Sequence, residues 1–130
     1  MVLGMGIDAV SLERMGSFPE GAIARFFHPS EVLQAEKLSG ARKAEFLATR
    51  FAAKEALGKA MGTGLRSLRL KDIAVVSDAL GKPSLILEGQ AASTFEVLFP
   101  QARLLLSLTH EHPLALAQVM IVAGGAYGAQ

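Results

Sequence analysis

Residues 41–61 read ARKAEFLATRFAAKEALGKAM, and this stretch decides the architecture that we expect for the chain. It is rich in Ala, Leu, Lys, Arg and Glu, contains no proline, and has Gly58 as its only glycine. These residue types favour the helical state, so the composition predicts one long helix. Gly62-Thr63-Gly64 follows directly and is expected to end the helix, because glycine readily adopts the left-handed conformation found there.

The predicted helix has two apolar sides when its residues are placed about 100° apart. One side groups Phe46, Ala53, Leu57 and Ala60, and the roughly opposite side groups Ala48, Phe51, Ala52, Gly58 and Gly62. Glu55 and Lys59 lie among the small residues of the second side, where another backbone or a ligand can approach closely. Glu55 is therefore a candidate functional acid. The alternative is an ordinary surface pair between Glu55 and Lys59, four residues apart.

The rest of the chain divides into short elements on both sides of this helix. Turn residues and β-branched runs predict strands at 1–10, 73–77, 84–88, 104–109 and 114–122. Short helical pieces are expected within 11–38, among them a helix over about 30–38 capped near Pro29-Ser30-Glu31, and a later helix over 89–99. Strands and helices are segregated, which predicts an α+β fold with a mostly antiparallel sheet packed on the long central helix. We expect one domain over 1–122 and a loose tail over 123–130.

The composition narrows the class of protein. The 130-residue chain is 51% hydrophobic and 19% charged, with a mean hydropathy of +0.36, which excludes an intrinsically disordered chain. Thirteen basic and 12 acidic residues give a net charge of +1, so a strongly basic nucleic-acid binder is not expected. The absence of cysteine excludes disulfides and a thiolate nucleophile.

The apolar excess does not indicate a membrane protein. The longest apolar run, over 114–123, is half the length of about 20 residues that a membrane span needs. The first ten residues lack the basic start of a signal peptide, and Asp8 interrupts them. We therefore expect a cytoplasmic protein with no membrane partner, whose apolar surface forms the interface of a homo-oligomer.

Two further candidate residues lie at strand ends. Asp8 ends the first strand, and together with Glu55 it would offer two carboxylates from different elements, which suit a hard cation such as Mg²⁺. Alone, Asp8 would be a cap or turn acid. His110 ends the run Ser107-Leu108-Thr109-His110, where a structural histidine is the simpler interpretation. A metal site on His110 and His112 would lack a third ligand.

Several nucleotide-binding patterns fail their context. Gly4 to Ala9 matches GxGxxA, but too few residues precede it for a strand and no helix-forming run follows. Gly58-Lys59-Ala60 and Gly81-Lys82-Pro83 lack the upstream glycine and the Ser/Thr of a phosphate-binding loop. No general nucleotide-binding motif therefore assigns a function.

Taken in order, however, the motifs resemble the holo-acyl-carrier-protein synthases, the short bacterial type of 4′-phosphopantetheinyl transferase. They are Gly6-Ile7-Asp8, Arg50-Phe51-Ala52-Ala53-Lys54-Glu55-Ala56 with Lys59-Ala60 and Gly62-Thr63-Gly64, Asp72-Ile73, Gly81-Lys82-Pro83 and Ser107-Leu108-Thr109-His110. The resemblance runs from about residue 4 to residue 122. The pattern FAxKEAxxKAxGxG is specific, whereas the other motifs gain their weight from their order.

The resemblance implies an enzyme of fatty acid biosynthesis that transfers 4′-phosphopantetheine from coenzyme A to a serine of apo acyl carrier protein and releases adenosine 3′,5′-bisphosphate. The family's Mg²⁺ acids fall on Asp8 and Glu55, and its catalytic positions also include Lys59 and His110. Its coenzyme A contacts fall on Arg50, Lys59, Gly62, Gly64, Lys82, Pro83, Thr109 and His110. The serine proton would pass to Glu55 or to a water on the metal, and the sequence does not choose between them.

The family is trimeric with its active sites between subunits, so the resemblance implies a homotrimer. Its basic surface for docking the carrier falls on Arg14 and Arg25, for which solvated helix charges are the alternative. Glu111 follows His110 where Asp is common in relatives, which leaves open whether this acid orients His110. Two other functions remain: a non-catalytic oligomeric module that binds an acidic partner or a nucleotide, and a transferase that serves carrier domains of a larger synthase.

Overall fold

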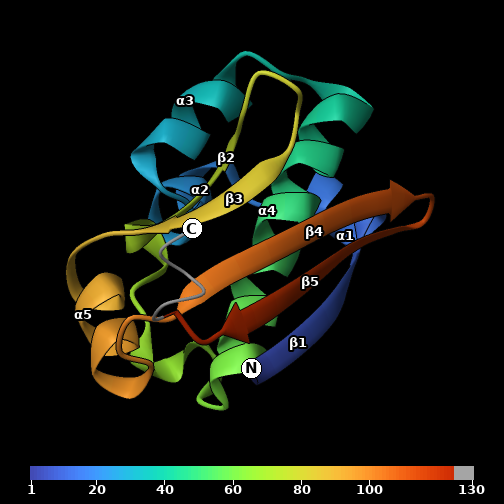
Figure 1. Ribbon diagram of the computed structural model, residues 1–130. Helices are drawn as coiled ribbons and strands as arrows, with labels where there is room; N and C mark the ends of the chain where they lie inside the picture. Colours follow the sequence, from blue (N-terminus) through green and yellow to red (C-terminus); the bar gives the residue numbers. More distant parts are fainter. Residues whose placement is uncertain (125–130) are drawn as a thin grey trace.

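A computed structural model describes residues 1–124 of the chain, which form an α+β fold with strands and helices close to those expected (Figure 1). The elements, in chain order, are β1 (Val2–Ser11), α1 (Leu12–Gly16), α2 (Glu20–Phe26), α3 (Pro29–Glu36), α4 (Gly40–Met61), η1 (Gly64–Ser67), η2 (Leu70–Asp72), β2 (Ile73–Ser77), β3 (Pro83–Leu87), α5 (Gly89–Leu98), β4 (Arg103–Glu111) and β5 (Leu114–Val122). The short helices η1 and η2 are of the 3-10 type.

Helix α4 has 22 residues and forms the centre of the core. Its alanines are buried on several sides, and Leu47 and Leu57 are buried with them. Gly62 ends the helix with φ 77°, in the left-handed region, as its position in the sequence predicted. The small residues of α4 let neighbouring elements lie close to its backbone on more than one side.

One face of α4 is covered by an antiparallel sheet with strand order β1-β5-β4, and Figure 1 shows this sheet lying across the helix. Alternate residues of the central strand β5 face α4 and are buried: Ala115, Ala117, Val119 and Ile121. Asp8 on β1 lies opposite Ala117, so its side chain also points to the helix side of the sheet. The register thus directs a polar residue toward α4 among apolar neighbours.

Two glycines of β1 make its close approach to α4 possible. A Cβ atom on Gly4 would overlap the carbonyl oxygen of Ala60, and one on Gly6 would overlap the carbonyl oxygen of Ala56 and lie 2.6 Å from the nitrogen of Ala60. Both obstacles are backbone atoms that cannot rotate away. Asp8 follows Gly6 by two residues and lies on the same face of β1, which brings its carboxylate within hydrogen-bond reach of Lys59 on α4.

Substituting Gly6→Ala is expected to lower the free energy of unfolding by about 1–3 kcal/mol, because β1 must move away from α4 to accommodate the methyl group. Gly21→Ala is the matched control. Its added Cβ would meet no atom within 4 Å, and alanine is the better helix former in α2. Urea denaturation of both variants measures the difference, and equal stabilities would contradict the close approach.

The outer face of the sheet, turned away from α4, exposes large apolar side chains. Met5 and Leu105 face this side and are 57% and 45% exposed, and Met120 of β5 lies between them. Ile7 is 59% exposed on the same face of β1. We define Met5, Ile7, Leu105 and Met120 as the outer sheet face. Such an apolar surface is typical of a subunit interface.

A second sheet consists of the antiparallel hairpin β2–β3 alone.

Helix α3 precedes this hairpin in the chain and is capped by a residue that the sequence analysis did not single out. We expected the cap within Pro29-Ser30-Glu31, but the imidazole of His28 accepts from the Ser30 nitrogen, and Glu31 in turn accepts from the His28 nitrogen. Glu31 thereby supplies the acid of a capping box in which His28 takes the place of the usual Ser or Thr.

The loose tail that we expected over 123–130 lies mostly outside the described residues. Within them, the nitrogen of Ala123 still donates to the carbonyl of Met1 at 2.8 Å. None of the helices in residues 1–124 is long and apolar enough to cross a membrane.

Candidate active site

Three of the expected site residues meet where β1 crosses α4. The ammonium group of Lys59 donates to Asp8 Oδ1 at 2.9 Å and to the carbonyl of Ile7 at 3.1 Å. Lys59 is therefore hydrogen-bonded to β1. The alternative interpretation of the sequence had paired Lys59 with Glu55 on the surface of the helix. The Asp8 side chain is only 16% exposed, whereas that of Lys59 is 53% exposed and open to solvent.

Glu55 lies half-buried beside this pair. Burial raises the pKa of its carboxyl group above the ordinary value of 4.5, and the negative charge of Asp8 raises it further. The positive charges of Lys59 and Arg14 act in the opposite direction. The Asp8 carboxylate therefore lies close enough to Glu55 to disfavour ionisation of Glu55, a situation that a bound cation would relieve.

The donor set at this position fits a magnesium ion. Asp8 and Glu55 provide hard oxygen ligands, and Mg²⁺ commonly binds through one or two carboxylates together with waters and substrate phosphates. Among residues 1–124 there is no cluster of three or more His, Cys, Asp or Glu side chains arranged to hold a metal. A cation that needs a full set of protein ligands is therefore not suited to this site, whereas one that shares its ligands with a phosphate is.

A second group of expected residues lines a cavity of about 350 Å³, which we call the His110 pocket. It lies between α4, the β2–β3 hairpin and the end of β4. Its basic and hydroxyl-bearing residues are Arg42, Thr49, Arg50, Ser77, Thr109 and His110, and its other lining residues include Phe46, Gly81 and Pro83. Arg50, Pro83, Thr109 and His110 were expected together, and the structure brings them together.

Arg50 lines this pocket and has one hydrogen-bond donor without a partner among residues 1–124. Its guanidinium carbon lies 4.2 Å from the centre of the Phe46 ring, and Nη1 donates to the hydroxyl of Thr49 at 3.0 Å. Its Nε is buried and has no hydrogen-bond partner among residues 1–124. Burial lowers the pKa of Arg50, against the opposing effect of Glu31. A desolvated guanidinium with a donor left over favours an anionic ligand.

The carboxylate nearest to His110 comes from a different element than expected. His110 Nε2 lies 3.7 Å from Glu45 Oε1, a residue near the start of α4. Glu111, which the sequence suggested as the partner, belongs to the end of β4 opposite Leu114. The sequence left open whether Glu111 orients His110. The structure places a different acid beside His110, Glu45, which precedes Glu55 by ten residues.

The two groups lie on different faces of α4. Arg50 and Glu55 are five residues apart, so their side chains leave the helix about 140° from one another. Glu45, beside His110, lies about 15 Å along the helix axis from Glu55.

The expected residues Gly62 and Gly64 lie at the C-terminal end of α4, one turn beyond Lys59. Lys82 lies in the hairpin turn and does not line the His110 pocket, and its nitrogen donates to Asp78.

Comparison with known proteins identifies the family. The sequence profile of the 4′-phosphopantetheinyl transferase superfamily matches residues 4–117. The chain belongs to this superfamily. A holo-[acyl-carrier-protein] synthase of Treponema pallidum is 44% identical over 123 residues, which covers 93% of the chain and 96% of the relative. The synthase of Geobacillus kaustophilus is 43% identical over 129 residues, covering 93% and 89%.

Solved structures of the superfamily have the same fold. The holo-(acyl-carrier-protein) synthase of Bacillus anthracis, in complex with CoA (3′,5′-ADP), has a TM-score of 0.82 and 35% identity, covering 95% of this chain and 99% of that one. The synthase of Neisseria meningitidis has a TM-score of 0.83 and 34% identity, covering 93% and 98%. The resemblance noted in the sequence is thereby confirmed at the level of family and fold.

The two arginines that were expected to dock the carrier, Arg14 and Arg25, lie in different settings. We call the group of Asp8, Glu55 and Lys59 the Asp8 cluster. Arg14 on α1 is close enough to Glu55 to lower the pKa of the Glu55 carboxyl group, which places α1 beside this cluster. Arg25 on α2 is exposed, and its guanidinium lies 5.9 Å from the ring of Phe26. Only Arg14 therefore borders the Asp8 cluster directly.

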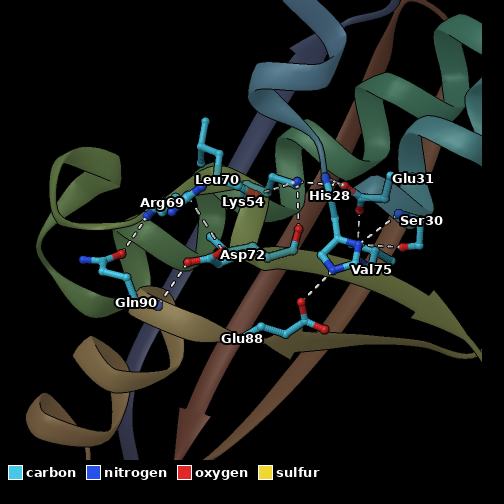
Figure 2. Close-up of polar contacts among 11 residues, drawn as sticks. His28, Ser30, Glu31, Lys54, Arg69, Leu70, Asp72, Val75, Glu88 and Gln90 are labelled. Atoms are coloured by element: carbon cyan, nitrogen blue, oxygen red, sulfur yellow. Dashed lines mark hydrogen bonds and ion pairs between the residues drawn. The ribbon is translucent and has the colours of Figure 1, made fainter.

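The sequence analysis missed one polar feature of this transferase fold. Glu31 on α3 and Lys54 on α4 form an ion pair at 2.7 Å with both side chains fully buried. Figure 2 shows this pair between α3, α4 and strand β2. Lys54 stands in the quoted motif directly before Glu55, but the sequence analysis gave it no role of its own. The spacing carried the signal, because Lys54 follows buried Leu47 by seven residues and precedes buried Met61 by seven.

A second, larger cavity shares Glu45 with the His110 pocket. It has a volume of about 670 Å³ and is formed by α1, α2 and the start of α4, with an apolar floor that includes Leu12, Met15 and Leu47. None of the expected site residues lines it. We therefore place the candidate active site at the Asp8 cluster and the His110 pocket, where charged groups converge.

Proposed function

We propose that the protein transfers the 4′-phosphopantetheine group from coenzyme A to a serine hydroxyl of apo acyl carrier protein, giving holo acyl carrier protein and adenosine 3′,5′-bisphosphate. The observation that carries this proposal is the crossing of β1 over α4, which sets Asp8 beside Glu55 with Lys59 hydrogen-bonded to Asp8. Two carboxylates that would hold a cation, together with an ammonium group, suit the pyrophosphate of coenzyme A in a member of the phosphopantetheinyl transferase superfamily.

Asp8 and Glu55 are the residues that would hold Mg²⁺. When bound there, the ion supplies Lewis-acid stabilisation of the charge on the transferred and leaving phosphates. Lys59 has a flexible stem and a half-exposed ammonium group, so it can reach a phosphate oxygen as a point charge. Burial and the charge of Asp8 raise the pKa of Glu55, so the Glu55 carboxylate is a candidate acceptor for the serine proton.

The His110 pocket would hold the adenosine end of coenzyme A. Arg42, Arg50 and His110 line it and attract the 3′-phosphate, and Phe46 and Pro83 provide apolar surface for the base. The unpartnered Nε of Arg50 supports an anionic ligand at this position. A volume of about 350 Å³ suits one end of coenzyme A rather than the whole molecule.

The arrangement of the two groups supports a homotrimer with sites between subunits. The Asp8 cluster and the His110 pocket lie on different faces of one α4, so a single donor would reach them most directly when they come from two copies. The outer sheet face, with Met5, Ile7 and Leu105 exposed, offers an apolar surface for that contact. We propose that each active site joins the Asp8 cluster of one subunit to the His110 pocket of its neighbour.

Mass spectrometry of apo acyl carrier protein tests the proposed function. Incubation with coenzyme A, Mg²⁺ and the protein is expected to add about 340 Da, the mass of phosphopantetheine, to the carrier. A carrier that binds the protein but keeps its mass would favour the non-catalytic binding module instead. Modification of excised carrier domains of larger synthases, but not of the free carrier, would favour the second alternative.

Reversing the charges of Arg14 and Arg25 is expected to raise the KM for acyl carrier protein by about tenfold with little change in the KM for coenzyme A. Acyl carrier proteins are acidic, so basic residues beside the site accelerate their encounter. The matched control reverses Lys71 and Arg103, which are exposed and lie outside the site. Steady-state kinetics at low and high salt measure both effects, and equal behaviour of the two double variants would contradict the docking role.

A further inference from the structure

The buried side chains of Glu31 and Lys54 form hydrogen bonds with backbone groups of several neighbouring elements. The carboxylate and the ammonium are 2.7 Å apart and fully excluded from solvent. The ammonium of Lys54 also donates to the carbonyls of Phe26 and Leu70, each at 3.2 Å, and its nitrogen lies 5.1 Å from the centre of the Phe27 ring. One ion pair therefore ties the ends of α2, α3 and η2 to α4 (Figure 2).

The same pair hydrogen-bonds the free edge of strand β2. Glu31 Oε2 accepts from the nitrogen of Val75 at 2.9 Å, and Lys54 donates to the carbonyl of Ile73 at 2.9 Å. Residues 73 and 75 point their backbone groups to the same edge, because orientation alternates along a strand. The other edge of β2 pairs with β3. Glu31 and Lys54 thus occupy the position that a third strand would take.

The hairpin held in this way forms one wall of the His110 pocket. Ser77, Gly81 and Pro83 belong to the hairpin and line the pocket, while Phe46 and Arg50 line it from α4. Arg50 lies one turn before Lys54 on the same helix, and Ser77 lies two residues beyond Val75 on the same strand. The separation of the two walls therefore depends on how β2 is attached to α4.

We propose that Glu31 and Lys54 are positioning residues for the donor nucleotide: by binding the edge of β2 to α4, they set the hairpin wall of the His110 pocket against Arg50. This inference rests on the proposed function, because it assumes that the pocket holds the adenosine end of coenzyme A. Neither residue lines the pocket, so both act through the hairpin and not by contact with the ligand.

A role in positioning explains why a charged pair occupies this place. Burial lowers the pKa of Lys54, against the opposing effect of Glu31, so its charge is retained at an energetic cost. Apolar residues of similar size would avoid the cost of burying two charges. They would not bind the nitrogen of Val75 and the carbonyl of Ile73, which need a directed acceptor and a directed donor.

Two variants separate positioning from stability. Lys54→Met removes every contact of the ammonium and leaves Glu31 charged and unpaired, so the melting temperature falls. The paired variant Glu31→Gln/Lys54→Met removes both charges, which relieves that strain and restores part of the melting temperature. Because neither variant can bind the carbonyl of Ile73, both are expected to bind adenosine 3′,5′-bisphosphate about tenfold more weakly than the wild type.

Calorimetry with adenosine 3′,5′-bisphosphate measures this affinity directly, at a temperature where each variant is fully folded. We expect the KM for coenzyme A to rise by the same factor, with the KM for the carrier and kcat little changed. We also expect the amides of Val75 and Ser77 to exchange faster with solvent. Ile121→Ala is the stability control, because it removes a fully buried side chain at the end of the sheet opposite to His110.

Each outcome decides the question. Wild-type affinity in Lys54→Met, or affinity that recovers in the paired variant along with the melting temperature, would overturn the positioning role. The same would follow if Ile121→Ala lost as much affinity at an equal drop in melting temperature. A wild-type protein that neither binds the bisphosphate nor modifies the carrier would instead contradict the proposed function, so the two failures are distinguishable.

Discussion

Replacing Glu55 with Gln is expected to reduce the rate of carrier modification by about a hundredfold or more. Losing one ligand charge removes several kcal/mol of transition-state stabilisation, and about 1.4 kcal/mol corresponds to a factor of ten in rate. Gln keeps the size of the side chain and removes its charge. Asp8→Asn is expected to have a comparable effect. The double variant should be little worse than either single one, because each substitution disables the same site.

The assay follows carrier modification against Mg²⁺ concentration for the wild type and the variants. Glu13→Gln is the matched control, because Glu13 is exposed on α1 and is not one of the proposed site residues. We expect the control to behave as the wild type does. If Glu55→Gln retained near wild-type turnover at low Mg²⁺, the proposed metal site would have to be assigned to other residues.

Thermal melts of the same variants test the electrostatics of the site without any substrate. The folded-state pKa of Glu55 is raised, so folding favours its protonated form. That stabilisation is complete below the ordinary pKa of 4.5 and is lost as the pH rises through the raised value. Without divalent ions, Glu55→Gln should therefore melt above the wild type at neutral pH, and the difference should disappear below about pH 4.

Mixing two inactive variants is expected to restore activity. Glu55→Gln subunits keep the His110 pocket, and His110→Ala subunits keep the Asp8 cluster. In every trimer that contains both variants, about one third of the shared sites would combine an intact cluster with an intact pocket. Co-expression of the two variants under different affinity tags, followed by two-step purification and the carrier assay, measures this recovery.

The control for this experiment mixes Glu55→Gln with Asp8→Asn. Both variants lack the same half of the site, so no arrangement of their subunits gives an intact one, and no recovery is expected. Recovery with the first pair and not with the second would support sites between subunits. Absence of recovery in mixed trimers of the first pair would show that each subunit carries its own complete site.

Much of the fold was accessible from the sequence because its elements have strong local signals. The long helix was predicted over 41–61 and is observed over Gly40–Met61, since helix formers fill it and a left-handed glycine ends it. The hairpin between 73 and 87 was predicted from two short apolar strands around a turn. The predicted cap of α3 lay within 29–31, whereas the observed cap is the preceding residue, His28. The prediction missed it because a histidine side chain is not a usual cap.

The candidate site was accessible only in part. The family motifs named Asp8, Glu55 and Lys59, but no local pattern indicates that glycines of β1 lie against α4, or that Lys59 bonds to Asp8 rather than to Glu55. The His110 pocket depends on contacts between α4, a hairpin and β4, which are far apart in the sequence. Lys54 was missed because its burial depends on a partner from another helix, Glu31.

The sheet order β1-β5-β4 has a consequence for how the protein is made. Within residues 1–124, strand β1 pairs only with β5, and Asp8 lies opposite Ala117, about a hundred residues downstream. A chain growing on the ribosome therefore exposes the apolar side chains of β1 until β5 has emerged from the exit tunnel. Pairing across such a separation makes folding slow and leaves the nascent chain open to aggregation. Asp8 is synthesised long before β5, yet it is fixed against α4 only after β5 has paired with β1.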